Sequence, residues 1–495
     1  MSNTCSGAEA LVFGALDSGV NLVTGVPGFP ITGIMELLMG FRLEVRWSIN
    51  EKVALEAALG ASAVGRRAMV IVKHVGMNVL ADPLVTSTTH TIGAGLVIIA
   101  GDDPGVQQSQ NEQDSRYYGL LAEVPVFDPC NPQVAYNSML QAFKLSEKVL
   151  APVIIRITDR SNREKGDVQR TQQGQLEFPV FDRDVWSYTM KGKHQRFHSS
   201  SYPKMQQAST ESGLNVRYDR GRDVGIISSG YLSTLVEQVL TDTYKDVSHL
   251  ALTLVNPLPM PVIDRFIEQH AKVLVVEETE KFIEHQLCRP GVLGKGTGHL
   301  DHGKVEAVDI ILALENIDWE TVSRPLNPET IASRGSSRSI CDDCPYHVLY
   351  RVLGTLGVPV AGDLGCSIRT APPPLEVVDI AYSLGSSIAT ATGFEDKGIA
   401  LIGDYGLVHT GLQGLIEAIH HKKDVLVVVL KNNIAALTGG QDVPDMTEVV
   451  RTLVPDTTVL DIENVDEAEL TELLKTELKK SGVSVLLARG KCTQY

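Results

Sequence analysis

Short apolar runs alternate with amphipathic stretches over the first 160 residues. Five of the runs have the length of buried strands, at 22–25, 47–49, 68–72, 95–99 and 153–157. The stretches at 8–16 and 51–64 have helical spacing instead. Strands that alternate with helices form a parallel sheet covered by helices on both faces. The pattern therefore predicts a doubly wound α/β domain at 1–165.

The alternation stops near residue 158 and resumes at 223. The polar sequence between these points shows no periodicity, so we expect 166–222 to be a polar linker or covering arm. Runs at 224–228, 250–255 and 273–277 predict the strands of a smaller α/β domain at 223–322. A Pro- and Ser-rich seam then leads into a third domain at 323–495. The expected fold class is α/β, with three doubly wound parallel-sheet domains.

The clearest chemical signal lies at 399–441. One apolar run ends in Gly403-Asp404-Tyr405-Gly406, an amphipathic stretch follows, and a second apolar run ends at Asn432-Asn433. A strand–helix–strand unit crosses over right-handed, so both polar ends emerge at one edge of the sheet. Asp404, Asn432 and the main-chain carbonyl of Ile434 then offer hard oxygen ligands for Mg²⁺. The glycines allow a diphosphate to approach the helix start. An ordinary α/β unit with polar loops would give the same pattern.

Glu51 is the second candidate. It begins a predicted helix, with Asn50 as N-cap, directly after a predicted strand. An acidic residue here can simply complement the helix dipole. A buried glutamate beside a coenzyme can instead act as a proton partner. A magnesium–diphosphate motif elsewhere in the chain favours the chemical interpretation.

Composition and charge narrow the class of protein. The chain has 495 residues with 43% apolar side chains, which is typical of a globular protein of several domains. A formal charge of −16 argues against a general nucleic-acid or anionic-membrane surface. Neither a membrane-spanning run nor a signal-peptide pattern is present, so we expect a cytoplasmic protein with no membrane partner.

Seven cysteines in a reducing compartment indicate free thiols or metal ligands. Cys341 and Cys344 form a CxxC, Cys366 follows the next strand signal, and Cys492 follows the last. Four thiolates at one sheet edge would suit zinc or an iron–sulfur cluster. The remaining three, Cys5, Cys130 and Cys288, are expected to be structural thiols.

Several long motifs resemble one family across nearly the whole chain. The chain is similar to the large (alpha) subunit of indolepyruvate:ferredoxin oxidoreductase, in the thiamine diphosphate (ThDP)-dependent 2-oxoacid:ferredoxin oxidoreductase superfamily. The matching stretches are NEKVALE at 50–56, KHVGMN at 73–78, SQNEQDSR at 109–116, VVEE at 275–278 and TGGQ at 438–441.

The resemblance implies a function for each domain. It makes 1–165 the pyrimidine-binding domain, 223–322 a transketolase C-terminal-like domain, and 323–495 the diphosphate- and Mg²⁺-binding domain with the cluster cysteines. Glu51 would bond the pyrimidine N1′. His74, at the end of a predicted strand, is the candidate for a substrate-side acid or base, and a loop histidine with satisfied hydrogen bonds is an equally good interpretation. A [4Fe–4S] cluster would be held by Cys341, Cys344, Cys366 and Cys492. The expected coenzyme-binding residues are Glu51, Gly28, Gly403, Asp404, Tyr405, Gly406, Asn432, Ile434, Leu437 and Thr438, and the expected substrate residues are Phe29, Lys73 and His74.

The implied reaction is oxidative decarboxylation of an aryl or bulky 2-oxoacid to acyl-CoA, with electrons leaving through the cluster to ferredoxin. The implied partners are a smaller catalytic subunit, ferredoxin or a ferredoxin-like subunit, the 2-oxoacid and coenzyme A. A dimer of the chain or of heterodimers is expected.

Three departures from the family pattern bear on the implied reaction and its substrate. The chain stops at Tyr495 without the usual ferredoxin-like domain, the cluster motif is CDDCPYH rather than CPGCPHR, and Phe29 replaces a threonine in the turn Pro27–Pro30. The missing ferredoxin-like domain keeps two alternatives open: a non-oxidative ThDP-dependent decarboxylase or carboligase, and a non-catalytic subunit that binds a cluster or partner.

Overall fold

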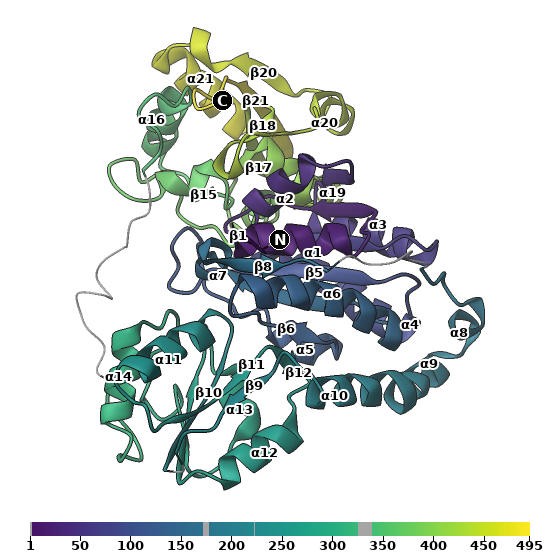
Figure 1. Cartoon of the computed structure of the whole chain (residues 1–495). Coiled ribbons are helices and arrows are strands. Elements are labelled where there is room, and N and C mark those ends of the chain that lie inside the picture. Colours follow the sequence, from purple (N-terminus) through teal and green to yellow (C-terminus); the bar gives the residue numbers. More distant parts are fainter. Residues whose placement is uncertain (1, 172–177, 222, 325–338) are drawn as a thin grey trace. The chain divides into compact units, whose positions relative to one another are not determined.

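The computed structural model describes residues 2–171, 178–221, 223–324 and 339–495 (Figure 1). The chain forms two compact units, Met1–Pro325 and Leu326–Tyr495. Each main sheet is built mostly from parallel strands with helices between them, which confirms the predicted α/β class. Within the described residues, no helix is both long and apolar enough to cross a bilayer.

A seven-stranded sheet forms the centre of the first unit. Six neighbouring strands are parallel, and the edge strand β12 pairs antiparallel with β6. In spatial order the strands are β12 (Leu254–Asn256), β6 (Val126–Phe127), β7 (Val153–Thr158), β5 (Leu96–Asp102), β4 (Ala68–Lys73), β2 (Leu22–Gly25) and β3 (Glu44–Trp47). The chain leaves β2 in one direction to form β3 and returns on the other side to form β4. This makes β2/β4 the topological switch point, where ligands bind in open α/β sheets.

Helices cover both faces of this sheet. One group packs as α2–α1–α6 and the other as α3–α4–α5, and right-handed crossovers put the two groups on opposite faces. Their bounds are α1 (Gly7–Asp17), α2 (Thr32–Met39), α3 (Glu51–Ala63), α4 (His74–His90), α5 (Tyr117–Ala122), α6 (Pro132–Val149) and α7 (Asp159–Arg163). Because both faces are covered, every residue of β2, β5 and β7 is buried. Side-chain caps fix the helix starts, as where Asn131 accepts from the N–H of Val134 at 3.0 Å.

The segment predicted as a polar linker contains regular structure that the sequence analysis did not predict. Strand β8 (Lys165–Gln169) pairs antiparallel with β1 (Ser2–Ser6). It is followed by α8 (Arg183–Ser187), α9 (Met190–Arg196), the π-helix η1 (Phe197–Ser201) and α10 (Tyr202–Thr210). These helices are short and mostly polar, and they are held by a few buried anchors such as Phe197 and Met205. Residues 172–177 and 222 of the predicted linker lie outside the described residues.

A second sheet of five strands completes the first unit. Its order is β14 (Val292–Leu293), β13 (Lys272–Val276), β10 (Val224–Ser229), β11 (Ser248–Leu252) and β9 (Val216–Tyr218), with β9 antiparallel. Its helices are α11 (Tyr231–Asp242), α12 (Met260–Glu268), α13 (Phe282–Leu287) and α14 (Ala307–Glu315). The single strand expected at 250–255 is divided at Thr253: β11 stays in this sheet, whereas β12 joins the seven-stranded sheet.

The second unit has one five-stranded parallel sheet. Its order is β15 (Val360–Ala361), β16 (Gly398–Gly403), β17 (Val425–Lys431), β21 (Val483–Arg489) and β20 (Thr458–Asp461). Its α-helices are α16 (His347–Thr355), α17 (Ser387–Ala391), α18 (Asp404–Gly406), α19 (Leu412–His420), α20 (Thr447–Leu453) and α21 (Glu467–Lys479). Shorter elements are η2 (Cys366–Thr370), η3 (Leu407–Gly411), β18 (Ile434–Ala435), η4 (Ala436–Thr438), β19 (Gln441–Asp442) and η5 (Ile462–Asn464).

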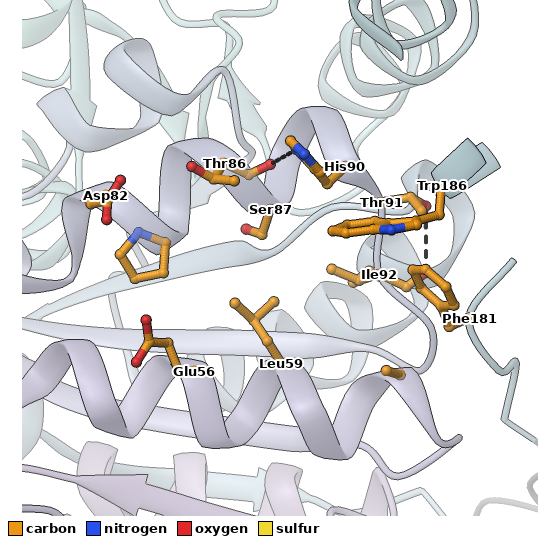
Figure 2. Close-up of a pocket in the computed structure, with 12 residues that line it drawn as sticks. Glu56, Leu59, Asp82, Thr86, Ser87, His90, Thr91, Ile92, Phe181 and Trp186 are labelled. Atoms are coloured by element: carbon orange, nitrogen blue, oxygen red, sulfur yellow. Dashed lines mark hydrogen bonds between the residues drawn. The ribbon is translucent and has the colours of Figure 1, made fainter. Parts of the chain in front are cut away.

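A groove lies between α3 and α4 and is closed at one end by the aromatic rings of Phe181 and Trp186 (Figure 2). It is lined from Glu56 onward on α3 and from Asp82 onward on α4, whereas both helices begin at the sheet edge with Glu51 and His74. The groove therefore belongs to the later turns of these helices and not to the edge that carries the candidate residues.

A buried ion-pair network joins the two sheets of the first unit. Arg116, with no exposed surface, pairs with Asp114 at 2.5 Å and with Glu277, at the end of β13, at 3.0 Å. It also donates to the main-chain carbonyl of Glu278. The stretches 109–116 and 275–278 thus meet in space, and Arg116 holds them together. A buried charge of this kind is tolerated only with its partners in place.

Replacing Arg116 with Met should strongly destabilise the first unit, because Asp114 and Glu277 would remain as buried, uncompensated carboxylates. The expected loss is about 3–5 kcal/mol. Arg66→Met is the matched control, since Arg66 pairs with Glu44 on the exposed surface and its loss should cost no more than about 1 kcal/mol. All three tryptophans lie in the first unit, so urea unfolding followed by tryptophan fluorescence reports on it. Coincident unfolding curves for the two variants would contradict the assigned role.

Candidate functional site

Four adjacent parallel strands bring the first-unit candidates to one edge. β3, β2, β4 and β5 are consecutive neighbours. Glu51 lies shortly beyond the carboxyl end of β3, and Gly28 lies shortly beyond that of β2. Lys73 is the last residue of β4, and His74 follows it. The half-buried Phe29 follows Gly28 in the same turn. The structure therefore gathers the predicted residues of the first unit at the switch point between β2 and β4 and at the neighbouring strand ends.

Glu51 is the first residue of α3 and is 6% exposed. The Asn50 side chain caps the helix by accepting from the N–H of Lys52 at 2.8 Å. The Glu51 carboxyl group lies against the first turn of α4, since a Cβ at Gly76 would stand only 2.6 Å from its Oε1. Gly76 is thus required for the position of this carboxylate. A residue that only complements the helix dipole can be exposed, whereas a proton partner of a coenzyme is expected to be buried. Glu51 is buried at the sheet edge.

Lys73 ends β4 and passes over Gly28. A Cβ at Gly28 would stand 3.1 Å from the Lys73 Cδ, so the glycine leaves room for the lysine stem. Burial lowers the pKa of Lys73 to about 8, although nearby Asp103 acts in the opposite direction. Asp103 accepts from the N–H groups of Gln107 and Gln108 and from Ser109 Oγ. Within the described residues, Lys73 forms no ion pair, which leaves a cation at the switch point with its charge uncompensated at short range.

His74 follows Lys73 and is fully buried. Its Nδ1 is 3.3 Å from the carbonyl oxygen of Gly101, and its Nε2 is 3.3 Å from the Asn111 side-chain amide. Burial lowers the pKa of His74, which favours the neutral ring. A neutral ring donates through only one nitrogen, so donation to Gly101 leaves Nε2 to accept from Asn111 in the flipped amide orientation. Asn111, which no expectation singled out by itself, thereby sets the orientation of His74.

In the second unit, Asp404 joins the ends of two neighbouring strands. It follows β16, and its Oδ2 accepts from the main-chain N–H groups of Asn432 and Asn433, just beyond β17, at 2.9 and 2.5 Å. The side-chain oxygen of Asn432 in turn accepts from the N–H of Ile434 at 3.1 Å. Burial raises the pKa of Asp404 to about 6, although the main-chain N–H groups of Asn432, Asn433 and Tyr405 lower it. The structure therefore brings Asp404, Asn432 and Ile434 together.

The other second-unit candidates surround this point. Gly403, Tyr405 and Gly406 flank Asp404, and a Cβ at Gly403 would meet no atom within 4 Å, so the chain is open to a ligand there. Leu437 and Thr438 lie in η4, just beyond β18. The Thr438 hydroxyl donates to Gln441 at 3.0 Å, which closes the TGGQ turn.

Asp363 belongs to this edge but was missing from the predicted set. It is fully buried beyond β15, and its Oδ1 accepts from Ser367 Oγ at 2.8 Å. Its Oδ2 has no hydrogen-bond partner among the described residues and points at Gly406, where a Cβ would overlap it. Burial raises the pKa of Asp363. The signal in the sequence was a second Gly-Asp pair, Gly362-Asp363, at the end of the strand before Gly403-Asp404.

The four predicted cluster cysteines lie in one region of the second unit, although no three of their Sγ atoms lie within 4.8 Å of one another. Cys344 interacts electrostatically with both Cys341 and Cys492, and burial raises its pKa. Burial raises the pKa of Cys366 to about 12, with further contributions from Cys344 and Cys492. The N–H of Cys344 donates to the carbonyl of Cys341 at 3.1 Å, which forms the CxxC turn. All four cysteines are partly buried, and no disulfide links them.

The chain is similar to proteins of one family. A family model described as the C-terminal TPP-binding domain of thiamine pyrophosphate (ThDP) enzymes matches residues 343–479. Indolepyruvate oxidoreductase subunit IorA of Archaeoglobus fulgidus is 31% identical, over 98% of this chain and 86% of that protein. The subunit of the same name from Pyrococcus abyssi is also 31% identical, over 99% of this chain and 85% of that protein.

A solved structure supports the fold. The 2-oxoglutarate:ferredoxin oxidoreductase of Magnetococcus marinus, with 2-oxoglutarate, coenzyme A and succinyl-CoA bound, gives a TM-score of 0.51 at 15% identity, over 64% of this chain and 65% of that chain. The similarity to the IorA subunits extends through both units and includes the region matched by the TPP-binding model. The chain therefore belongs to the indolepyruvate oxidoreductase IorA family and is a subunit of a thiamine pyrophosphate-dependent 2-oxoacid oxidoreductase.

Proposed function

We propose that the chain is the catalytic subunit of a ThDP-dependent 2-oxoacid:ferredoxin oxidoreductase that converts an aryl or otherwise bulky 2-oxoacid to its acyl-CoA. The observation that carries the proposal is the position of Tyr346. This buried side chain interacts electrostatically with Asp404 and also with Cys344, Cys366 and Cys492. The expected magnesium ligand and the expected cluster ligands are thus neighbours within one unit, as electron transfer from the coenzyme to a cluster requires.

The second unit has donors that fit Mg²⁺ and a diphosphate. A carboxylate, an amide oxygen and a main-chain carbonyl are hard ligands of the kind that Mg²⁺ prefers, and Asp404, Asn432 and Ile434 supply them. The space at Gly403 allows phosphate oxygens to approach the backbone. When bound, ThDP supplies the carbon nucleophile for decarboxylation of a 2-oxoacid.

In the first unit, the proposed role of Glu51 is to hold the proton at the pyrimidine N1′. Its burial and its packing against Gly76 restrict the carboxyl group to one position. Such a fixed, desolvated carboxyl group can share a proton with a ring nitrogen. His74 is the proposed acid or base on the substrate side, and in that role its Nε2 would exchange the contact with Asn111 for one with the substrate.

The substrate carboxylate would bind Lys73. Phe29 stands where the family resemblance implies a threonine hydroxyl. Its aromatic ring favours an aryl side chain in the substrate, but the turn then lacks the hydroxyl donor for the substrate carboxylate. Lys73 lies on the adjacent strand end and has no ion-pair partner within the described residues, so it supplies a positive charge instead. An aromatic ring beside a cation matches the two ends of an arylpyruvate.

The cluster would be a [4Fe–4S] centre on Cys341, Cys344, Cys366 and Cys492. Thiols become thiolate ligands when a metal takes their protons, and burial raises the pKa of two of the four, Cys344 and Cys366. The Tyr350 hydroxyl lies against Cys344 and would tune such a cluster. This donor set favours the oxidative reaction over a simple decarboxylase, which has no use for it. Electrons would pass to ferredoxin or a ferredoxin-like subunit, alongside a smaller catalytic subunit in an oligomer.

Cys366→Ser should remove iron and electron output together. Anaerobically prepared wild-type chain with its partner subunit is expected to contain about four iron atoms per chain and to reduce a viologen with aryl 2-oxoacids and coenzyme A. The variant should lose most of the iron and the viologen reduction. Cys288→Ser, on an exposed cysteine outside the group, is the control and should retain both. A Cys366→Ser protein with full iron content and unchanged viologen reduction would refute the assignment.

The KM for the 2-oxoacid should depend on pH through Lys73. Its pKa of about 8 lies below the ordinary lysine value of 10.5, so the ammonium is present below pH 8 and is lost above it. We expect KM to rise by up to about tenfold per pH unit above 8. Lys73→Met should have a raised KM with no such rise, whereas Lys52→Met, on an exposed lysine of α3 paired with Glu56, should follow wild type. A wild-type KM that is flat from pH 7 to about 9.5 would contradict this role.

A further inference from the structure

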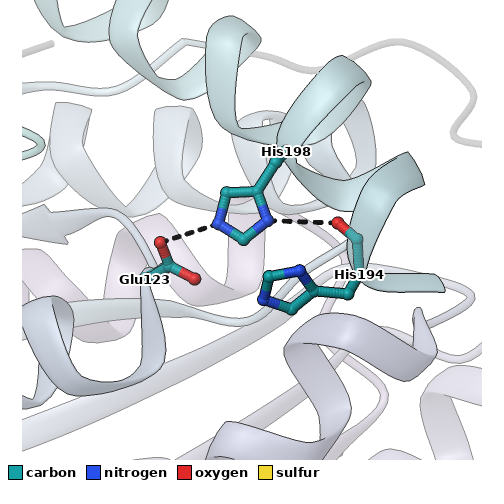
Figure 3. A group of neighbouring side chains, drawn as sticks. All are labelled: Glu123, His194 and His198. Atoms are coloured by element: carbon teal, nitrogen blue, oxygen red, sulfur yellow. Dashed lines mark hydrogen bonds and ion pairs between the residues drawn. The ribbon is translucent and has the colours of Figure 1, made fainter. Parts of the chain in front are cut away.

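A second group of potential metal ligands lies in the first unit, away from the candidate residues at the sheet edge. Glu123, His194 and His198 place one carboxylate oxygen and two imidazole nitrogens within 4.8 Å of one another (Figure 3). Among the described residues, no other set of three such side chains converges in this way. The two imidazole rings are tilted by 45° to each other, with centroids 4.3 Å apart.

The local structure fixes all three side chains toward one point. His194 lies in α9 and His198 four residues later in the π-helix η1, so both project from the same side of the continuous helix. Glu123 is the C-cap of α5 and adopts a left-handed conformation with φ of 55°. A left-handed non-glycine residue is uncommon, and π-helical turns are often found at functional sites. Both features help to direct ligand atoms into the gap between α5 and the segment α9–η1.

The hydrogen bonds of His198 leave a place for a cation. Its Nδ1 is 3.1 Å from the main-chain carbonyl of His194, so this nitrogen must donate. Its Nε2 faces Glu123 Oε1 at 2.9 Å. In the neutral ring, Nε2 is therefore an acceptor, and it faces the Glu123 carboxylate, which is also an acceptor. This contact is favourable only when a cation lies between the two atoms. A proton can take this place, and the hydrogen bond to Glu123 accordingly raises the pKa of His198. A main-chain carbonyl on Nδ1 is also the usual outer partner of a metal-bound histidine.

We propose that Glu123, His194 and His198 form a binding site for a divalent transition metal, with Zn²⁺ as the best match. Two imidazoles and one carboxylate suit Zn²⁺, whereas Mg²⁺ and Ca²⁺ prefer oxygen-only sets. Ligand bonds of about 2.0–2.2 Å place the ligand atoms of a tetrahedral site roughly 3.4 Å apart. Binding therefore requires the Nε2–Oε1 pair, now at 2.9 Å, to open slightly and all three ligand atoms, now within 4.8 Å of one another, to settle at similar distances. His194 is exposed, so the ion can enter from solvent.

The site would connect two segments that otherwise share few anchors. α5 follows directly after the motif 109–116, whose Arg116 joins the two sheets. The segment α9–η1 is polar, with Phe197 as its main buried apolar side chain. A metal bridging the two would hold this polar segment on the first unit without a larger apolar interface. Its role would be structural, separate from the proposed coenzyme chemistry.

Zinc titration of the full chain tests the site. Because the cluster cysteines also bind metals, the experiment uses anaerobic protein with its iron content measured and unchanged between variants. Isothermal titration should show one equivalent of Zn²⁺ bound by wild type. His194→Ala and His198→Ala should each weaken that binding by about tenfold or more. His420→Ala is the matched control: His420, His421 and Glu417 are also two histidines and a glutamate at a helix end, but their ligand atoms do not converge.

A second readout excludes a merely structural effect of the substitutions. Lys191 is exposed in α9, so trypsin can report on the order of this helix. Zn²⁺ should slow cleavage there in wild type and in His420→Ala, and should have no effect in His194→Ala. Co²⁺ bound at this site should show no thiolate charge-transfer absorption, which distinguishes it from the cysteines. Identical zinc isotherms for wild type, His194→Ala and His198→Ala would overturn the proposal, as would cleavage that Zn²⁺ leaves unchanged in all of them.

Discussion

All strands of a parallel sheet point the same way, so polar residues that follow different strands collect at a single edge. This constraint places Gly28, Glu51 and His74 together in the first unit, although more than forty positions separate Gly28 from His74 along the chain. It acts again in the second unit, where Asp404 and Asn432 follow neighbouring strands and are bonded to each other. Each unit thus presents a buried carboxylate at the edge where a ligand of an α/β sheet is expected.

Burying these carboxyl groups opposes stability, and the structure offsets that cost differently in different places. Arg116 and Arg156 have carboxylate partners on more than one side, as expected of ion pairs that only hold the fold together. Asp404 accepts hydrogen bonds from main-chain N–H groups, and one oxygen of Asp363 has no partner among the described residues. Lys73 similarly has no ion-pair partner among the residues that the structure describes. Incomplete compensation of this kind is typical of sites that complete their interactions with a ligand.

The sequence predicted the parts of the fold that depend on strong local periodicity. The strand at Leu22–Gly25 and the start of α3 at Glu51 agree with the structure to the residue, because an apolar run or a side-chain cap sets them locally. The division at Thr253 was missed because β11 and β12 form one apolar run, and only tertiary pairing decides that they join different sheets. The strand expected at 47–49 lies at Glu44–Trp47, since alternation in an edge strand is weaker evidence than a buried run.

The site showed the same division between local and tertiary information. Residues within a motif, such as Asp404 and Lys73, could be chosen from sequence. Asn111 and Asp363 were not chosen, although the first lies in a quoted motif and the second in a Gly-Asp pair, because their importance lies in what they touch: His74 in one case and Gly406 in the other. The helices of 183–210 were missed because their few buried anchors leave no apolar stripe for a pattern to reveal. The approach of His194 and His198 to Glu123 depends on those helices and was therefore equally hidden.

The central claim of the proposed function is that Glu51 acts as the proton partner of bound ThDP. The most direct test is the exchange of the thiazolium C2 proton for deuterium in coenzyme bound to the full chain with Mg²⁺, measured by acid quench and proton NMR. The account predicts fast exchange in wild type and in Glu56→Gln, whose carboxylate is exposed on the same helix, and exchange about 10²–10⁴ times slower in Glu51→Gln with the coenzyme still bound. Equal exchange rates in all three proteins would contradict it.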